Sequence, residues 1–460
     1  MPSAPPDSPP AAATAPSAPP TPATPLARAA IALAFWVTMA GTTVPTPLYP
    51  IYQQVFGFSP LMVTVTFAVY AAGVVVGLLT LGRLSDRIGR RPVMAGALLL
   101  AAAAAGLFEA ASALPWLLVA RVASGLAAAL VTGAATAALL DLAPPERRLR
   151  AQILALAANM GGLAGGTLLS GILAEWAGSP LRLPWTVMLA LTAVALLGLF
   201  AVPESVPGGG PREALREAHH AAVHTPPRTA SRKAHRETAG NAPGSTGAAL
   251  PPSFEPPLVP TAIRPALLRA ALTAGSGFAA LGVLTSVSGL FLATVLGIHH
   301  HALTGLVACL AFVATGAGQL LARVLPGPRA LPAACAGLVV AAALVATALL
   351  TGTLPPLLLG AVLNGLATGT AVATGLATGL ATINGGVEPR RRGEVISAYF
   401  AVLYTMLSVP VVGAGLLIRA TDLRTAGVVF SALVAVLAVG VAAGLTGRRA
   451  RPTPLAAEEA

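Results

Sequence analysis

The segment GRLSDRIGRR, residues 82–91, carries five charged side chains within ten residues. Two apolar runs flank it, LMVTVTFAVYAAGVVVGLLTL at 61–81 and PVMAGALLLAAAAAGLF at 92–108. A helix needs about 17–25 apolar residues to cross the hydrocarbon core of a bilayer, and both runs fall in that range. The pattern therefore predicts a charged turn between two helices that cross a membrane.

The composition of the whole chain supports a membrane protein. Of its 460 residues, 55% are hydrophobic and only 10% are charged, and the mean hydropathy is +0.79. A soluble domain carries roughly 25% charged residues, so this chain has too few charges to cover a surface in water. The net charge of +12 comes from arginine clusters between apolar runs, and this distribution argues against nucleic-acid binding.

Twelve apolar runs are long enough to cross a bilayer. Backbone groups in lipid must find hydrogen-bond partners within their own segment, so we expect each run to be a helix. The predicted fold is an all-α integral membrane protein with twelve transmembrane helices in two six-helix bundles. The predicted spans are 27–48, 60–81, 92–112, 115–140, 151–176, 184–202, 266–292, 301–322, 330–351, 355–384, 394–418 and 425–446.

Polar segments divide the chain into five predicted parts. Residues 1–25 are rich in Pro and Ala, lack a basic start, and are expected to form a disordered cytoplasmic tail. Residues 204–263 are rich in Gly, Pro, Arg and His and are expected to form a cytoplasmic linker. The two bundles are then expected at 26–203 and 264–448, followed by a cytoplasmic tail at 449–460.

Arginine clusters predict the orientation of the chain. They lie in the even-numbered links between spans, and such clusters favour the cytoplasmic side. Both termini are therefore expected in the cytoplasm. The similar segments after spans four and ten, ERRLRAQI (146–153) and RRRGEVIS (390–397), suggest two parallel copies with a binding site at their interface. The arginines of the even-numbered links are Arg83, Arg87, Arg90, Arg91, Arg147, Arg148, Arg150, Arg323, Arg329, Arg390, Arg391 and Arg392.

Three motifs resemble the major facilitator superfamily of transporters. GRLSDRIGRRP (82–92) resembles the signature loop between its second and third helices, and LVARVASGLAAA (118–129) resembles its fourth-helix motif. PTPLYPIYQQVFGFS (45–59) is similar to a bacterial group usually described as efflux transporters. One departure is NMGGLAGGTLLSG (159–171), which has the glycines of the fifth helix of drug–proton antiporters without their Gly-Pro pair.

The resemblance implies a conformational latch, meaning charged contacts that hold the two bundles together on the cytoplasmic side. Gly89 is free to take a positive φ at the turn. The start of span eleven, near Glu394, would present the positive end of its helix dipole to Asp86. For Arg87 and Arg91 the alternative is that they only set the topology. The implied latch residues are Gly82, Asp86, Arg87, Gly89, Arg90, Arg91 and Asp141.

Three charged residues are candidates for proton or charge coupling. Arg121 lies inside span four, where a charge is costly and is a functional candidate by default. Alternatively, Arg121 snorkels outward or pairs with Glu109 across the hairpin. Glu109 and Glu175 lie near outer helix ends, and no acidic residue lies in the middle of a predicted span. Coupling through Asp141 or through a cationic substrate stays open.

In the family that this chain resembles, helices one, four, seven and ten line the cavity. The small share of aromatic residues, 5%, makes a hydrophobic or amphiphilic solute a better fit than a sugar. For each serine or threonine, the alternative is helix packing or a bond to the backbone. The candidate cavity residues are Trp36, Thr42, Thr136, Ser286, Asn364 and Thr368.

The predicted function is secondary active transport across the cytoplasmic membrane by alternating access, as proton-coupled efflux of a small hydrophobic or amphiphilic solute. The alternatives are uptake of a nutrient or metabolite by the same fold, and a membrane sensor that transports nothing. No nucleotide-binding or hydrolase motif is present. We therefore expect no enzymatic activity and no cofactor. The run of histidines at 299–301 is expected in an outer loop, without a metal.

Overall fold

The computed structural model describes residues 24–82, 84–204, 259–387 and 392–446. Within these ranges the chain forms helices and no strand. Among the described residues, twelve helical segments are long and apolar enough to cross a membrane, which confirms the predicted number of spans. Most of the predicted tails and linker, together with Arg83, Arg390 and Arg391, lies outside the described residues.

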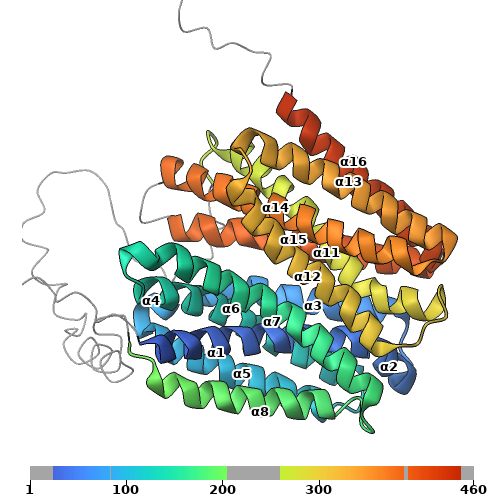
Figure 1. Ribbon diagram of the computed structural model, residues 1–460, viewed down its shortest axis with the longest axis horizontal. Coiled ribbons are helices and arrows are strands. Elements are labelled where there is room, and N and C mark those ends of the chain that lie inside the picture. The colour runs from blue at the N-terminus through green and yellow to red at the C-terminus, as the bar shows by residue number, and fades with distance from the viewer. Residues whose placement is uncertain (1–23, 83, 205–258, 388–391, 447–460) are drawn as a thin grey trace, which may run out of the picture.

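The helices form two bundles that lie side by side (Figure 1). The first comprises α1 (Pro25–Thr43), α2 (Pro45–Phe56), α3 (Pro60–Leu81), α4 (Leu84–Ile88), α5 (Arg90–Glu109), α6 (Leu114–Asp141), α7 (Arg148–Trp176) and α8 (Leu183–Gly198). Short 3₁₀ turns precede α7, at Pro145–Arg147, and follow α8, at Leu199–Ala201. The second comprises α11 (Arg264–Thr294), α12 (His301–Val324), α13 (Gly327–Thr351), α14 (Leu354–Gly386), α15 (Arg392–Ala420) and α16 (Leu423–Thr446). The end of the molecule that carries α4 is called the α4 end, and the other the opposite end.

The first span differs from its prediction, because it runs to Phe56 and is broken at Val44. Pro45 and Pro47 have no backbone N–H, so the hydrogen-bond ladder of α1 cannot continue through them. Pro45 then starts α2 as its first residue, a position that suits proline. Gly57, with φ at 66°, ends α2 in the left-handed conformation.

Glycines set the closest helix contacts inside each bundle. A Cβ atom at Gly125 of α6 would meet the backbone of α3, and one at Gly162 of α7 would meet the backbone of α1. In the second bundle, a Cβ atom at Gly365 or Gly369 of α14 would meet backbone carbonyls of α12. Side chains at these positions would push the helices apart, so small residues hold each bundle together as in other membrane proteins.

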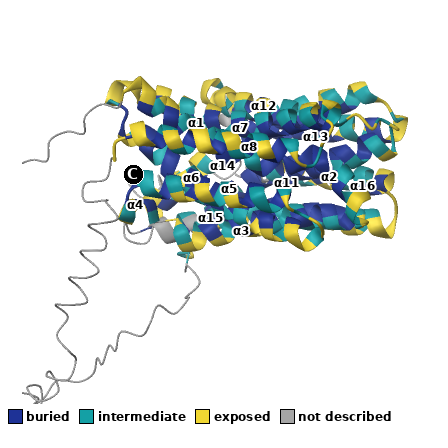
Figure 2. Ribbon diagram, turned by 90° about the horizontal axis from the view of Figure 1, so that it is seen from below, coloured by how far each residue is buried: buried dark blue, intermediate teal, exposed yellow. Residues whose placement is uncertain are grey.

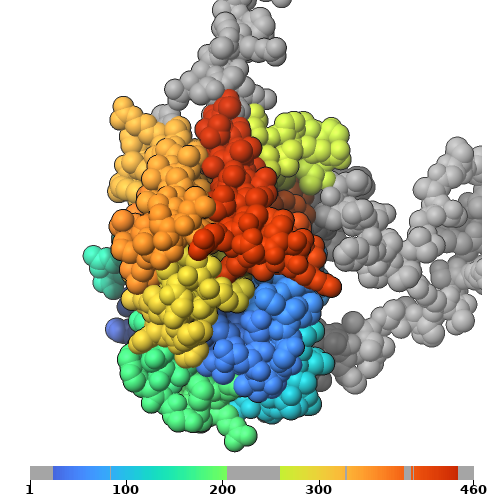
Figure 3. All heavy atoms as spheres, turned by 90° about the vertical axis from the view of Figure 1, so that its right-hand side faces the viewer, coloured from blue at the N-terminus to red at the C-terminus, as the bar shows by residue number. Residues whose placement is uncertain are grey.

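Two helix pairs make most of the contacts between the bundles: α3 packs on α15, and α7 packs on α12. Smaller contacts join α2 to α11 and α12, and α3 to α11. Figure 3 views the opposite end and shows the yellow region of α11 and α12 seated against the blue and green first bundle. Figure 2 shows buried residues through the interior of both bundles. Large apolar side chains such as Leu197 and Val436 stay exposed on the outside, as expected for a surface that contacts lipid.

The turn between α15 and α16 contains a helix cap. Asp422 Oδ1 accepts hydrogen bonds from the backbone N–H groups of Arg424 (2.8 Å) and Thr425 (3.0 Å). Its Oδ2 accepts one from the Thr425 hydroxyl at 2.6 Å. The bonds from Thr425, strengthened by the Arg424 backbone and charge, lower the pKa of Asp422, because they favour the ionised carboxylate.

Candidate functional site

The charged turn of residues 82–91 is built around Gly89 and Arg90. Gly89 has φ at 103°, which agrees with the prediction of a positive φ there. It ends the short helix α4 and lets Arg90 begin α5. Gly82, in contrast, keeps a helical conformation where α3 ends. The turn thus places Arg90 between α4 and α6.

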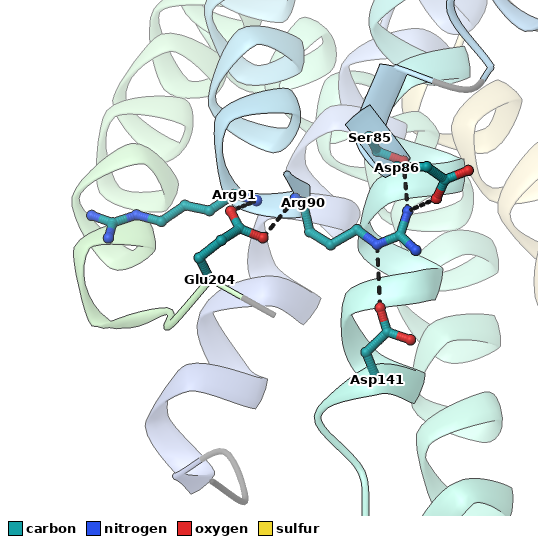
Figure 4. A network of polar contacts seen from close by, with 6 residues as sticks. All are labelled: Ser85, Asp86, Arg90, Arg91, Asp141 and Glu204. Atoms are coloured by element: carbon teal, nitrogen blue, oxygen red, sulfur yellow. Dashed lines mark hydrogen bonds and ion pairs between the residues drawn. The ribbon is translucent and has the colours of Figure 1, made fainter. Parts of the chain in front are cut away.

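Arg90 connects three helices of the first bundle (Figure 4). Its Nη1 donates to Asp86 Oδ1 and, at 2.8 Å, to Ser85 Oγ. Its Nε donates to Asp141 Oδ2 at 3.2 Å. Asp86 and Asp141 are 62% and 42% exposed, so these ion pairs add little to stability. Their effect is to fix the position of the turn.

Glu204 belongs to the same network and was not predicted. Its Oε1 accepts from the backbone N–H of Arg90 at 2.8 Å, and its Oε2 accepts from that of Arg91 at 3.0 Å. Figure 4 shows its carboxylate at the first turn of α5. The start of a helix favours negative charge. Glu204 therefore caps α5 and fastens the end of the sixth span to the charged turn.

The predicted latch stays a prediction. The contacts of Asp86, Arg90 and Asp141 described here all lie within the first bundle, and the side chain of Glu394 is outside the described part. Arg87 is exposed. The guanidinium of Arg91 points away from Glu204 (Figure 4) and lies 5.6 Å from the centre of the Phe200 ring.

Arg121 is buried inside the first bundle, with only 1% of its surface exposed. Its Nη1 donates to the carbonyl oxygen of Thr42 at 2.6 Å. Its Nε donates to the hydroxyl of Tyr49 at 2.9 Å, and its Nη2 donates to the same hydroxyl. The guanidinium also lies 5.4–5.8 Å from the centres of the Tyr49, Tyr70 and Phe108 rings.

These contacts explain how a cation is tolerated there. The Thr42 carbonyl belongs to the last turn of α1, where carbonyl groups lack helical partners and the helix dipole is negative. Aromatic faces add further attraction for a cation. Neither alternative for Arg121 agrees with the structure, because it is buried and Glu109 instead accepts a hydrogen bond from the Thr186 hydroxyl at 3.0 Å. Arg121 thus stabilises the break between α1 and α2.

Glu175 lies at the opposite end and contacts the second bundle. Its Oε2 accepts a hydrogen bond from the backbone N–H of His301 at 2.6 Å. The same oxygen is 3.6 Å from Nδ1 of His300, whose ring meets Trp176 edge-on at 5.8 Å between centres. Since His301 is the first residue of α12, Glu175 of α7 caps a helix of the other bundle.

The backbones of α7 and α12 also approach closely near Glu175. A Cβ atom at Gly171 would lie 2.7 Å from the carbonyl oxygen of His301, and one at Gly305 would meet the carbonyl oxygen of Thr167. On the other helix pair, a Cβ atom at Gly415 of α15 would meet Thr64 of α3. These contacts close the opposite end between the bundles.

The candidate cavity residues have different surroundings. Trp36 and Thr136 are half-buried in the first bundle, and Trp36 packs against glycines of α7. Thr42 is buried beside Arg121, to which its carbonyl is bonded. Ser286 donates to the carbonyl oxygen of Val283 at 3.2 Å. This agrees with the alternative given above, in which the hydroxyl bonds to the backbone.

Thr368 and Asn364 are buried within the second bundle. The Thr368 hydroxyl lies 3.1 Å from the carbonyl oxygen of Gly277 and 3.1 Å from Asn364 Oδ1. Asn364 also lines a small cavity between α11, α13, α14 and α16. These two side chains thus connect helices of one bundle.

Two bundles of membrane-spanning helices, with a buried cation in one and a carboxylate bridging both, define a multi-pass membrane protein. The family model of the Major Facilitator Superfamily matches residues 31–409. The chain belongs to this superfamily, which indicates a transporter rather than an enzyme.

The chain is also similar to individual proteins. It is 29% identical over 160 residues to the inner membrane transport protein YnfM of Escherichia coli (strain K12), a match that covers 35% of this chain and 36% of YnfM. The match thus spans about a third of that relative.

Solved structures share the fold at low identity. A bacterial homologue of the human lysosomal transporter Spinster, in an inward-facing and unoccupied conformation, has a TM-score of 0.64 at 17% identity, covering 94% of this chain and all of that one. A mutant of the nucleoside transporter NupG has a TM-score of 0.61 at 12% identity, over 90% and 99% of the two chains. The human organic anion transporter MFSD10 has a TM-score of 0.56 at 16% identity, over the same shares.

Proposed function

We propose that this protein is a secondary active transporter that exports a small hydrophobic or amphiphilic solute across the cytoplasmic membrane in exchange for protons. The observation that carries the proposal is the contact of Glu175 with α12. A proton that binds to the Glu175 carboxylate would weaken this contact between the two bundles. Uptake by the same fold remains the second candidate.

The proposed orientation puts the α4 end, and both termini, in the cytoplasm. The exposed arginines support it, because most of those described lie at the α4 end and such clusters favour the cytoplasmic side. Arg182, Arg419 and Arg424 are exposed at the opposite end. The contacts at the opposite end then close the outer side. A closed outer side is what we propose for an inward-facing state, the state in which the Spinster homologue was solved.

The proposed coupling site is Glu175 rather than Glu109 or Arg121. The bonds of Glu109 and Arg121 described above lie within the first bundle. A proton on Glu175 would remove the charge that holds the start of α12 and would favour separation of α7 from α12. Protonation of Glu175 from the outer side would thus link the outer pH to opening of that side.

The proposed latch at the α4 end acts in the opposite sense, by holding the bundles together when the outer side is open. Asp86 is central to it, because its carboxylate is largely exposed beside Arg90. The substitution Asp86→Asn should leave membrane insertion intact and lower transport. Unchanged transport would remove Asp86 from the latch.

The function is tested in two steps with purified protein. Counterflow of a labelled amphiphilic cation in proteoliposomes separates a transporter from a sensor, because a sensor exchanges no label across the membrane. Everted vesicles with an imposed pH gradient then give the direction. Accumulation of the solute that requires an acidic lumen supports export by exchange, whereas its loss from the lumen on acidification supports uptake.

A further inference from the structure

An apolar groove runs between α15 and α16 on the outside of the second bundle. It has a volume of about 600 Å³ and is lined by Ala279 of α11, by residues of α15 from Val409 to Ala420, and by residues of α16 from Phe430 to Leu437. Val409 and Leu433 on its walls are 62% and 60% exposed. Because α15 turns Gly415 toward α3, this groove is separate from the contact between the bundles.

A smaller cavity adjoins the groove inside the second bundle. It has a volume of about 70 Å³ and lies between α11, α13, α14 and α16. Phe430 and Val434 line both spaces, so the two adjoin at α16. By the same measure a water molecule needs about 10–15 Å³, so the cavity has room for the end of a small organic molecule.

One polar atom in the cavity wall lacks a partner. Ser288 is 3% exposed and lines the cavity, and its Oγ makes no hydrogen bond with the described residues. Two neighbours on the same helix differ, since Thr285 and Ser286 donate to backbone carbonyls one turn earlier. Asn364 of α14 also lines the cavity. A buried hydroxyl without a partner is unfavourable, so the cavity is suited to a ligand with a hydrogen-bonding group.

The depth of the site restricts the ligand further. Ser288 lies six residues before the end of α11 at Thr294, which at 1.5 Å per residue is roughly 9 Å below the helix end. The groove lies on the outside of the bundle, where exposed apolar residues such as Val409 and Leu433 are expected to contact lipid. A ligand that arrives there must dissolve in the bilayer.

We propose that the groove and the cavity form one binding site for a medium-chain alcohol, or another amphiphile with one hydroxyl group, that enters from the membrane. The alkyl chain lies in the groove beside Phe430, and the hydroxyl bonds to Ser288 Oγ and the Asn364 side chain. The site does not depend on the transport proposed above, because it lies within one bundle and its occupation can be measured without transport.

The test is photoaffinity labelling of the full-length protein in phosphatidylcholine nanodiscs. The probe is decanol with a diazirine in the middle of its chain, and adducts are mapped by mass spectrometry. Because the middle of the alkyl chain lies in the groove, we expect saturable adducts on α15 and α16 at residues 409–420 and 430–437. Unlabelled decanol should compete about fivefold better than decane, since one hydrogen bond distinguishes them.

Two variants and one control make the test specific. Ser288→Ala should reduce competition by decanol to the level of decane, and Ala342→Phe should abolish the saturable adducts by filling the cavity. Ser286→Ala is the matched control, because its hydroxyl is bonded to the backbone and should not affect labelling. Labelling that never saturates, equal competition by decane, or labelling unchanged by both variants would overturn the proposal.

Discussion

Replacement of Glu175 by Gln should shift the protein toward the state in which the opposite end is open. Glu175 is 22% exposed at its side chain, so its bond to the His301 N–H is partly shielded from water. Hydrogen bonds to charged groups contribute about 1.5–3 kcal/mol, and a carboxylate at a helix start adds about 0.3–1 kcal/mol. Glutamine keeps the acceptor oxygen and loses the charge.

The loss should therefore be about 1–2 kcal/mol, which is roughly a fivefold to thirtyfold change in the ratio of open to closed molecules. The contribution of His300 is left out of this figure because its side chain is 46% exposed and solvent screens the ion pair. Glu175→Ala removes the acceptor as well and should shift the ratio further.

The assay is the distance between spin labels on exposed residues of the two bundles at this end. Ser179 follows α7 and His299 precedes α12, and cysteines at these positions take the labels after Cys309 and Cys335 are replaced. Glu109→Gln is the matched control, because Glu109 bonds to Thr186 of its own bundle. The prediction for Glu175 is wrong if Glu175→Gln leaves the distribution of label distances unchanged, or if Glu109→Gln widens that distribution equally.

Four further substitutions test contacts within the bundles. Tyr49→Phe removes the hydroxyl that accepts hydrogen bonds from Arg121 and should destabilise the protein by about 1.5–3 kcal/mol. Tyr52→Phe loses only a neutral hydrogen bond from Trp185 and should destabilise it by about 1 kcal/mol. Reversible unfolding in mixed micelles compares the two variants. Glu204→Ala should raise hydrogen exchange at the first turn of α5 without affecting α12; equal exchange in both proteins would remove the cap. Asp422→Ala should raise hydrogen exchange at the start of α16. In the wild type, protection there, corrected for intrinsic exchange rates, should fall as the pH drops below 3.8, the ordinary pKa of the group, because a lowered pKa gives stability that is lost on protonation. Protection that persists in acid would contradict this.

The twelve spans could be predicted because length and hydropathy are properties of a single segment. The break in the first span could also have been found, since Pro45 and Pro47 lie two residues apart and both interrupt a helical ladder. The predicted span ended at residue 48 because the following segment, YPIYQQVF (49–56), is more polar. In the structure the tyrosines of that segment are buried, and one of them bonds to Arg121.

The partners of the charged residues could not be predicted in the same way. Glu204 is separated from Arg90 by 114 positions, and hydropathy does not say which helix ends meet. The sequence signal was an acid directly after span six, next to an arginine-rich turn. Glu109 was a reasonable partner for Arg121 by sequence distance, but α6 turns Arg121 toward the broken first span.

The direction in which polar residues point around each helix also could not be predicted from the sequence. Every face of these helices is apolar, so the pattern does not distinguish the face toward the cavity from the face toward a neighbour. Thr368 shows this, because it lies on a predicted cavity helix and bonds within its own bundle. Assignment of cavity residues by helix number alone therefore mixes ligand contacts with packing contacts.

The distribution of charged contacts has a consequence for movement between the bundles. The contacts of Arg90, Glu204 and Arg121 hold helices of the first bundle together. These contacts do not change when that bundle moves as a unit. Glu175 differs, since its bond to α12 must break if α7 and α12 separate. A protein that rocks two bundles needs stiff contacts within each and few strong contacts between them, because the strong ones set the free-energy difference between its states. If the bundles move as proposed, a small chemical change at Glu175, such as one proton, would therefore act on the equilibrium of the whole molecule, whereas the same change at Glu109 would act only on the first bundle.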